Sequence, residues 1–200
     1  EALIVDERDN GGGNLPWFFV EKLARTSRTK VQNRNARDSM NSPIIEGPKV
    51  MLINENAGSG GDMLPYLFRE AKLGPLIGKR TWGGLVGIGG SAPLVDGGFL
   101  TAPEFSIYDP KINEIVAENT GVDPDIDIDN RPDLVAQGRD PQLERAVEYL
   151  LDQLKKLPAK KPRTTIPVAV RQGVCPLASA SARVSPSLRT SLARSASLGS

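Results

Sequence analysis

Residues 49–62 read KVMLINENAGSGGD, and this stretch decides the fold. Its apolar start predicts a buried strand over 49–55, and a glycine- and serine-rich loop follows directly. The next residues, GDMLPYLFREAKLG, predict a helix that ends at Gly74. Apolar residues at helical spacing mark the expected buried face of this helix: Leu64, Leu67, Phe68 and Ala71. The stretch is therefore a strand, a small-residue loop and a helix in immediate succession.

The same succession stands at the start of the chain. ALIV (2–5) predicts a buried strand, DERDNGGGN (6–14) a glycine loop, and LPWFFVEKLAR (15–25) a helix with Pro16 in its first turn. Five residues of this helix fall near helical spacing: Leu15, Phe18, Phe19, Lys22 and Leu23. Two successive strand–helix units predict an α/β domain whose sheet is mixed and at least partly parallel, with flanking helices.

Three further elements are predicted downstream. PLIGKR (75–80) supplies a short buried segment, and SAPLVDGGFLTAPEFSIYD (91–109) reads as a hairpin that turns at Asp96-Gly97-Gly98. The last helix has Asp140 as its cap and Pro141 at its first position. Its apolar stripe comprises Leu143, Val147, Leu150, Leu151 and Leu154.

Composition bounds the function. The 200 residues include 25 basic and 24 acidic side chains, and this balance argues against nucleic-acid binding as the main activity. No apolar run reaches the roughly 18–20 residues of a membrane span. A single cysteine, Cys175, excludes an internal disulfide and a cysteine-rich metal site. The chain has no histidine, so a Ser-His catalytic machine cannot be built from these residues alone.

The two ends of the sequence differ in character from the domain between them. The chain starts within a predicted strand, without a signal peptide or an initiator methionine, and we expect it to be a fragment truncated at its N-terminus. Residues 158–200 form a basic tail rich in Ser, Arg, Ala and Pro, which we expect to be disordered. A shifted reading frame in a GC-rich gene is one explanation for this tail. The predicted domain covers 1–157.

Ser59 stands between glycines at the strand-to-helix loop. A serine there can be a nucleophile, because the dipole and free N–H groups of a helix N-terminus favour developing negative charge. The pattern differs from G-x-S-x-G, since glycines occupy the positions before, after and two after the serine. The alternative is that Ser59 only caps the helix in a glycine-rich turn.

The glycines at 11–13 occupy the equivalent loop after the first strand. In a parallel sheet, both loops lie at the carboxyl ends of their strands, on the same edge. The two loops can then supply a pair of N–H donors to one oxygen, as in an oxyanion hole. The alternative is two unrelated tight turns. No G-x-G-x-x-G dinucleotide motif is present.

Four motifs in order, DERDNGGGN, NENAGSGGD, GKRTWGGLVGI and ENTGVDPDI, resemble the catalytic half of tricorn-type serine proteases over roughly residues 1–157. Such enzymes are related to the carboxyl-terminal processing peptidases and share a crotonase/ClpP-like α/β core. The resemblance implies Ser59 as nucleophile, the backbone N–H groups of Gly12 and Gly60 as oxyanion hole, and Glu118 as a member of a catalytic tetrad. The other members, a Ser-His pair, lie upstream of a PDZ domain in such proteins.

Position 80 distinguishes the two subfamilies, and a run of alternating aspartates raises the question of a metal site. The processing peptidases use a lysine as general base where Arg80 stands, and arginine cannot be deprotonated in proteins. Lys79 is adjacent and is expected to point elsewhere. Asp123, Asp125, Asp127 and Asp129 alternate, but without the EF-hand glycine and terminal glutamate they are expected to form a solvated loop or strand edge.

The sequence thus predicts a segment of a serine endopeptidase that cleaves peptides or unfolded fragments, with no metal or cofactor. Two alternatives remain: a Ser/Lys processing peptidase, which Arg80 disfavours, and a non-catalytic binding module of the same fold. The resemblance implies a trimer-based hexamer and a cytoplasmic location, although an export signal could precede the segment. Peptides are the expected partners, with no nucleic acid and no membrane.

Overall fold

The computed structural model describes residues 1–27, 29–31, 39–40, 44–90 and 92–159. Residues 1–157 form one compact unit, and residues 158–200 cluster as a second unit. All but the first two residues of the second unit lie outside the described residues, so the predicted disorder of the tail lies outside them too.

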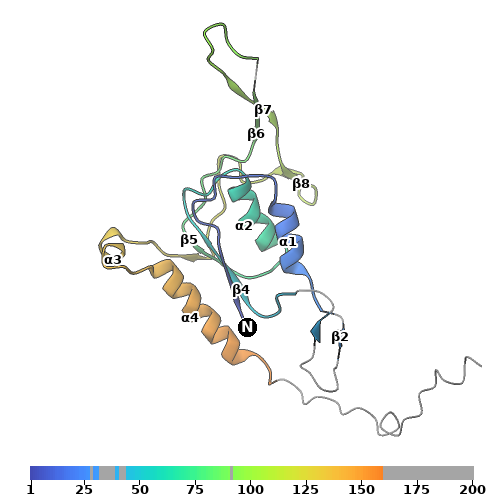
Figure 1. Ribbon diagram of the computed structural model, residues 1–200, viewed down its shortest axis with the longest axis vertical. Helices are drawn as coiled ribbons and strands as arrows, with labels where there is room; N and C mark the ends of the chain where they lie inside the picture. The colour runs from blue at the N-terminus through green and yellow to red at the C-terminus, as the bar shows by residue number, and fades with distance from the viewer. Residues whose placement is uncertain (28, 32–38, 41–43, 91, 160–200) are drawn as a thin grey trace, which may run out of the picture. The chain divides into compact units, whose positions relative to one another are not determined.

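A four-stranded parallel sheet is the centre of the first unit (Figure 1). Its strands are β1 (Leu3–Asp6), β4 (Lys49–Ile53), β5 (Leu76–Gly78) and β10 (Ile126–Asp127), in the order β1-β4-β5-β10. Every residue of β4 is buried, which is typical of a parallel strand covered on both faces. The three strands predicted from apolar runs are confirmed, whereas β10, in the aspartate-rich segment, was not predicted.

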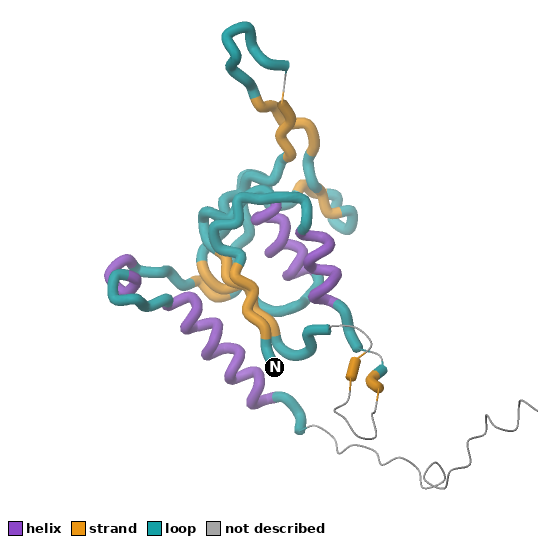
Figure 2. Tube along the Cα trace, in the orientation of Figure 1, coloured by secondary structure: helices purple, strands orange, loops and turns teal. Residues whose placement is uncertain are grey.

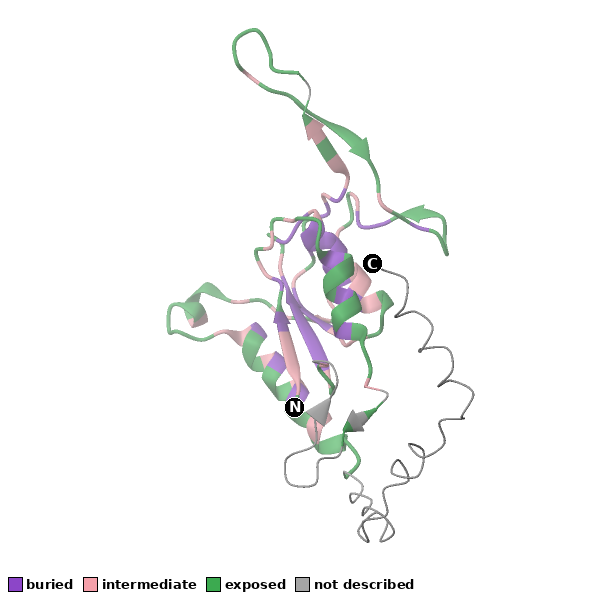
Figure 3. Cartoon of the chain, turned by 45° about the vertical axis from the view of Figure 1, so that its right-hand side comes forward, coloured by how far each residue is buried: buried purple, intermediate pink, exposed green. Residues whose placement is uncertain are grey.

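Helices cover both faces of this sheet. Met51 and Ile53 of β4 pack with residues of α1 (Pro16–Ala24) and α2 (Gly60–Glu70). Val50 and Leu52, which point to the opposite face, pack against Ala146 and Leu150 of α4 (Pro141–Lys156). Figure 3 shows the buried residues gathered on the strands and on the inward sides of these helices. A fourth, short helix, α3 (Pro132–Val135), precedes α4.

The antiparallel pairs form separate two-stranded sheets, so parallel and antiparallel pairing do not share one sheet in the described residues. They are β2 (Lys30–Val31) with β3 (Ser39–Met40), β6 (Gly87–Gly90) with β7 (Thr101–Phe105), and β8 (Tyr108–Asp109) with β9 (Glu114–Ile115). The β6–β7 pair is a hairpin, as predicted, but its first strand, Gly87–Gly90, lies wholly before the predicted range 91–109. Figure 2 shows this hairpin standing apart from the parallel sheet.

Two predicted helix faces are only partly right. In α1, Leu23 is buried as predicted, whereas Phe18 and Phe19 are exposed and Val20 is buried. In α4, Leu143, Val147 and Leu151 are exposed, and the buried positions are Gln142, Ala146 and Leu150. Helical spacing shows that a face exists, but docking partners decide which side of the helix is covered.

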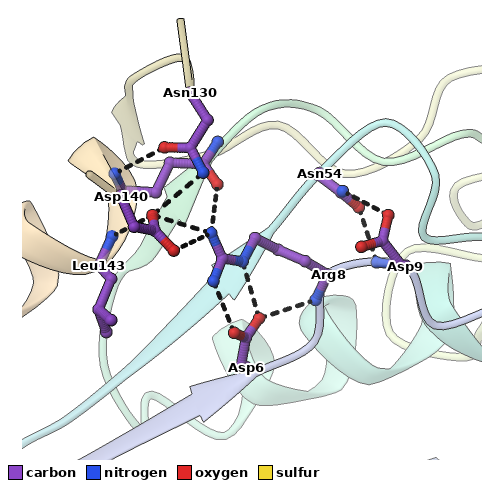
Figure 4. A network of polar contacts seen from close by, with 8 residues as sticks. Asp6, Arg8, Asp9, Asn54, Asn130, Asp140 and Leu143 are labelled. Atoms are coloured by element: carbon purple, nitrogen blue, oxygen red, sulfur yellow. Dashed lines mark hydrogen bonds and ion pairs between the residues drawn. The ribbon is translucent and has the colours of Figure 1, made fainter. Parts of the chain in front are cut away.

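Polar contacts decide the side for α4. Arg8, just after β1, donates from Nη1 to Asp140 at 3.0 Å and from Nη2 to Asp6 at 2.7 Å (Figure 4). Asp140 caps the helix as predicted, because its Oδ1 accepts the N–H of Leu143 at 3.0 Å. The side chain of Gln142 donates to the main-chain oxygen of Ile128 at 3.0 Å. These bonds hold the N-terminus of α4 at the sheet edge where the glycine loops lie.

Candidate active site

Ser59 lies at the sharp turn between β4 and α2. Its backbone has φ 58° and ψ −116°, whereas a capping residue ordinarily has extended, negative-φ geometry. A non-glycine residue held in such a conformation costs of order 1–3 kcal/mol, and such strain clusters at active sites. The geometry therefore goes beyond what a plain helix cap requires, and the half-buried side chain stays accessible.

The two glycine loops meet at Ser59, as the parallel arrangement predicts. The main-chain N–H of Gly58 donates to the oxygen of Asn10 at 3.0 Å, which joins the loop after β4 to the loop after β1. A Cβ built on Gly12 would lie 2.9 Å from the Cβ of Ser59 and 3.3 Å from the nitrogen of Gly60. Gly12 also has φ 122°, so only glycine fits against the serine here.

The two N–H groups expected to form an oxyanion hole are in different states. Gly60 is the first residue of α2, and an N–H at that position has no partner within its helix. The N–H of Gly12 donates to Oδ1 of Asn10 at 3.0 Å. One expected donor thus stands at a helix N-terminus, and the other is engaged inside its own loop.

Asp62, which sequence reasoning missed, is a fully buried carboxylate beside the serine. Its Oδ2 accepts the N–H groups of Ser59 at 2.8 Å and Gly84 at 3.1 Å. Its Oδ1 accepts the hydroxyl of Thr81 at 2.6 Å and the N–H of Gly83 at 2.8 Å. The carboxylate therefore fixes the strained turn to the loop at 81–84. The spacing S-x-x-D at a helix start was the signal that could have found it.

Glu118 lies in a loop that packs against the same segment. Its Oε2 accepts the N–H groups of Leu85 at 2.8 Å and Val86 at 2.7 Å. The residues on either side, Ala117 and Asn119, both have positive φ, so the backbone is sharply turned around this glutamate. The N–H of Asn119 donates to the oxygen of Gly83 at 2.8 Å. Glu118 is thereby connected to Ser59 through the 81–86 segment and Asp62.

Lys79 and Arg80 are unsuited to take a proton from the serine. The ammonium of Lys79 lies 2.7 Å from Oδ1 of Asp127, and this bond raises the pKa of the lysine. A lysine acting as base needs the opposite shift, because it must be neutral at working pH. Arg80 is exposed, and its guanidinium stays protonated.

The alternating aspartates serve the edge of the sheet. Asp127 belongs to β10, and Asp125 accepts the N–H of Leu76 at 2.7 Å and pairs with Arg69 at 3.1 Å. Across the described ranges, no group of three or more potential ligands is placed to hold a metal ion.

Glu7 is a second buried carboxyl group that the sequence did not reveal. It is 4% exposed and lines a cavity of about 360 Å³ together with Asn10, Gly12, Pro16, Phe19 and Leu64. Burial raises the pKa of Glu7 to about 7, and the negative charges of Asp6 and Asp62 add to this rise, against the opposing hydrogen bond from Asn10. With a pKa near neutral pH, Glu7 can change its charge under physiological conditions.

The chain is similar in sequence to known peptidases. Residues 1–128 match the sequence profile of Peptidase family S41. A relative from Sulfurisphaera tokodaii, named as a tricorn-like protease C-terminal subunit, is 43% identical over 158 residues, covering 78% of this chain and 18% of its own. The tricorn protease of Thermoplasma volcanium is 42% identical over 164 residues, covering 81% and 16%.

The fold of this chain also resembles that of a solved structure. The crystal structure of the tricorn protease superposes with a TM-score of 0.72 at 39% identity, over 77% of this chain and 15% of that one. The chain thus spans less than a fifth of the length of these relatives. In the part of the chain that the structure describes, no helix has the length and apolar character to cross a membrane.

Proposed function

The chain belongs to Peptidase family S41, and we propose that it carries the nucleophile and oxyanion donors of a tricorn-type serine endopeptidase that hydrolyses peptides or unfolded protein fragments. The observation that carries this proposal is the strained backbone of Ser59 at the N-terminus of α2, with Gly12 packed against it. The crotonase/ClpP-like class of the sheet, which the resemblance implies, is part of the proposal.

The reaction follows from the positions of these groups. Ser59 Oγ attacks the scissile carbonyl and forms an acyl-enzyme, while the peptide bond breaks and the amine leaves. The carbonyl oxygen becomes negatively charged, and the N–H of Gly60 together with that of Gly12 stabilises it at the positive end of the α2 dipole. Water then hydrolyses the acyl-enzyme and regenerates the serine.

The proton of Ser59 needs a base that this sequence does not contain, because it has no histidine. We propose that a histidine from an upstream segment of the full protein serves, and that Glu118 supports this group by hydrogen bonding and charge. The pairing of Lys79 with Asp127 disfavours the Ser/Lys mechanism. The strain at Ser59 disfavours a pure binding module, which needs neither oxyanion donors nor a strained serine.

The remaining features of the whole protein are part of the same proposal. Peptides are its substrates, and it assembles as a trimer-based hexamer in the cytoplasm. No metal or cofactor takes part.

Ser59→Ala in the assembled full-length protein tests the proposal. We expect kcat for a peptide substrate to fall by about 10³-fold or more, with the free energy of unfolding nearly unchanged, because alanine removes only the attacking oxygen. Ser106→Ala, which changes an exposed serine, is the matched control and keeps full activity. Peptidase activity that survives Ser59→Ala would refute the central role of this residue.

A further inference from the structure

Asn10 bridges two groups beside the serine. Its Nδ2 donates to Oε1 of Glu7 at 3.0 Å, and its Oδ1 accepts the N–H of Gly12 at 3.0 Å. Its main-chain oxygen accepts the N–H of Gly58. The same oxygen lies so close to Gly61 that a Cβ built on Gly61 would be 2.2 Å from it. The backbone of Asn10 is therefore fixed against the Ser59 loop, while its side chain links Glu7 to Gly12.

The bond between Asn10 and Gly12 occupies the N–H group of Gly12, which is one of the two proposed oxyanion donors. The N–H of Gly12 points to Asn10, and a well-aligned hydrogen bond to that oxygen competes with donation to a substrate oxygen at Ser59. The orientation of the Asn10 amide thus controls the second donor of the pair.

The orientation of the amide depends on the charge of Glu7. A carboxylate only accepts hydrogen bonds, so ionised Glu7 requires the NH₂ end of Asn10 to face it, and Oδ1 then faces Gly12. A neutral carboxyl group can also donate. It can therefore hold the oxygen of Asn10 instead, and the NH₂ end then turns toward Gly12, whose N–H loses its acceptor.

We propose that Asn10 is a positioning residue for the oxyanion loop, whose amide holds the Gly12 N–H while Glu7 is ionised and releases it when Glu7 is neutral. The proposal rests on the proposed function for the meaning of that release, because the freed N–H would then be available to the substrate oxygen at Ser59.

The surroundings of Glu7 allow both states. Within the described residues, the charged groups that act on it are Asp6 of β1 and Asp62 of α2, both negative. The other elements around the cavity contribute apolar side chains, including Pro16, Phe19 and Leu64. With its pKa raised to about 7, chiefly by burial, Glu7 changes charge near neutral pH.

Amide NMR of the ¹⁵N-labelled 200-residue chain tests the proposal without any turnover. Between about pH 5 and pH 9, the Gly12 amide and the Asn10 side-chain NH₂ should shift with one common midpoint, that of Glu7. In Glu7→Gln both should lose this titration, and the Gly12 amide should stay at its low-pH position, because glutamine both donates and accepts. Asn14→Ala, in the same loop and cavity, is the control that keeps the wild-type titration.

Hydrogen exchange gives an independent measurement. Asn10→Ala should accelerate exchange of the Gly12 amide, relative to the wild type, above about pH 7, where ionised Glu7 keeps this bond in place, and much less at about pH 5, where the wild type already releases it. The Gly58 amide, bonded to the main-chain oxygen of residue 10, should stay protected throughout. A Gly12 amide that does not titrate, or that titrates equally in Glu7→Gln, overturns the proposal. Because the spectra need no catalysis, a positive result combined with activity after Ser59→Ala would refute the proposed peptidase role of Ser59 alone.

Discussion

Two buried carboxyl groups support the loops around Ser59. Asp62 accepts the N–H of Ser59, and Glu7 is linked through Asn10 to Gly12, which packs against Ser59. Neither burial was predicted, because acidic residues are mostly exposed in proteins. The S-x-x-D spacing at the start of α2 was a signal for Asp62, and Glu7 had no comparable signal. The turn at Ser59 could be predicted because glycine and serine after an apolar run point to a tight strand-to-helix turn, whereas the roles of Gly12 and Gly60 were implied by the family resemblance. Their convergence followed from parallel strand order, whereas the partners of Asp62 come from the 81–84 loop, whose path the sequence does not indicate.

Glu118→Gln tests a single charge. Glutamine keeps an oxygen that can accept the N–H groups of Leu85 and Val86, so the free energy of unfolding should change by about 1 kcal/mol or less. Loss of the negative charge should lower kcat of the assembled enzyme by about 10²-fold or more, if Glu118 supports the catalytic base. Steady-state kinetics beside Glu114→Gln, an exposed glutamate in β9, measures this. Unchanged kcat in Glu118→Gln would remove Glu118 from the catalytic group.

Glu7→Gln tests the buried charge through stability. The folded protein binds the Glu7 proton more tightly than the unfolded chain, since the pKa rises from 4.5 to about 7. The resulting stabilisation is complete below the unfolded pKa and is lost as pH rises through about 7. The free energy of unfolding lost in this way is up to about 3 kcal/mol, since each pKa unit of the shift corresponds to about 1.4 kcal/mol.

Urea unfolding at about pH 5 and pH 8 measures this effect. The wild type should be less stable at the higher pH, and Glu7→Gln should lose most of that difference. The carboxyl groups with lowered pKa, such as Asp109 and Asp140, titrate below this window and do not interfere. Equal pH dependence in the two proteins would show that Glu7 is not the responsible group.

At the scale of elements, apolar runs predicted β1, β4 and β5 correctly because parallel strands are buried on both faces and lack alternation. The two-residue strand β10 escaped prediction because its aspartates mask it. The buried side of α4 was only partly predicted. Leu150 is buried as expected, but polar bonds to Arg8 and Ile128 hold the helix at its N-terminus and Ala146 faces the sheet in place of Val147.

Arg8→Met tests how α4 is held. The guanidinium is mostly buried between Asp6 and Asp140, and its removal leaves both carboxylates and Gln142 without that donor. We expect a loss of about 1–3 kcal/mol in the free energy of unfolding and faster amide exchange in the first turn of α4. Arg131→Met, which breaks an exposed pair with Asp133, should change stability by about 0.5 kcal/mol or less. Similar losses in the two variants would contradict a special role for Arg8.

At the scale of the whole molecule, the missing base gives a direct prediction for the 200-residue chain. It has no histidine, and Lys79 is held by Asp127, so Ser59 lacks a group to take its proton. Purified alone, the chain should neither turn over peptides nor react at Ser59 with a fluorophosphonate probe. Adding the proposed upstream Ser-His segment, in cis or in trans, should restore both once the two pieces dock.

Labelling with and without that segment measures the effect, and Ser59→Ala provides the blank. Strong labelling of the chain by itself would reveal a base within residues 1–157, and a Ser/Lys mechanism through Lys79 would then have to be reconsidered.

The order of the parallel sheet also governs how the chain acquires its structure during synthesis. The N–H of Asp9 donates to Asn54, 45 residues away in the sequence, and joins the loops after β1 and β4. The N–H of Val122 donates to Thr81, which is 41 residues away. Contacts of such long sequence separation slow folding, because closing a long loop costs chain entropy before the contacts it brings together can stabilise the fold. The strained turn at Ser59 is held by Gly12 on one side and by Asp62 with the 81–84 loop on the other. We therefore expect the turn at Ser59, the proposed nucleophile, to form late, after most of the sheet has left the ribosome and assembled.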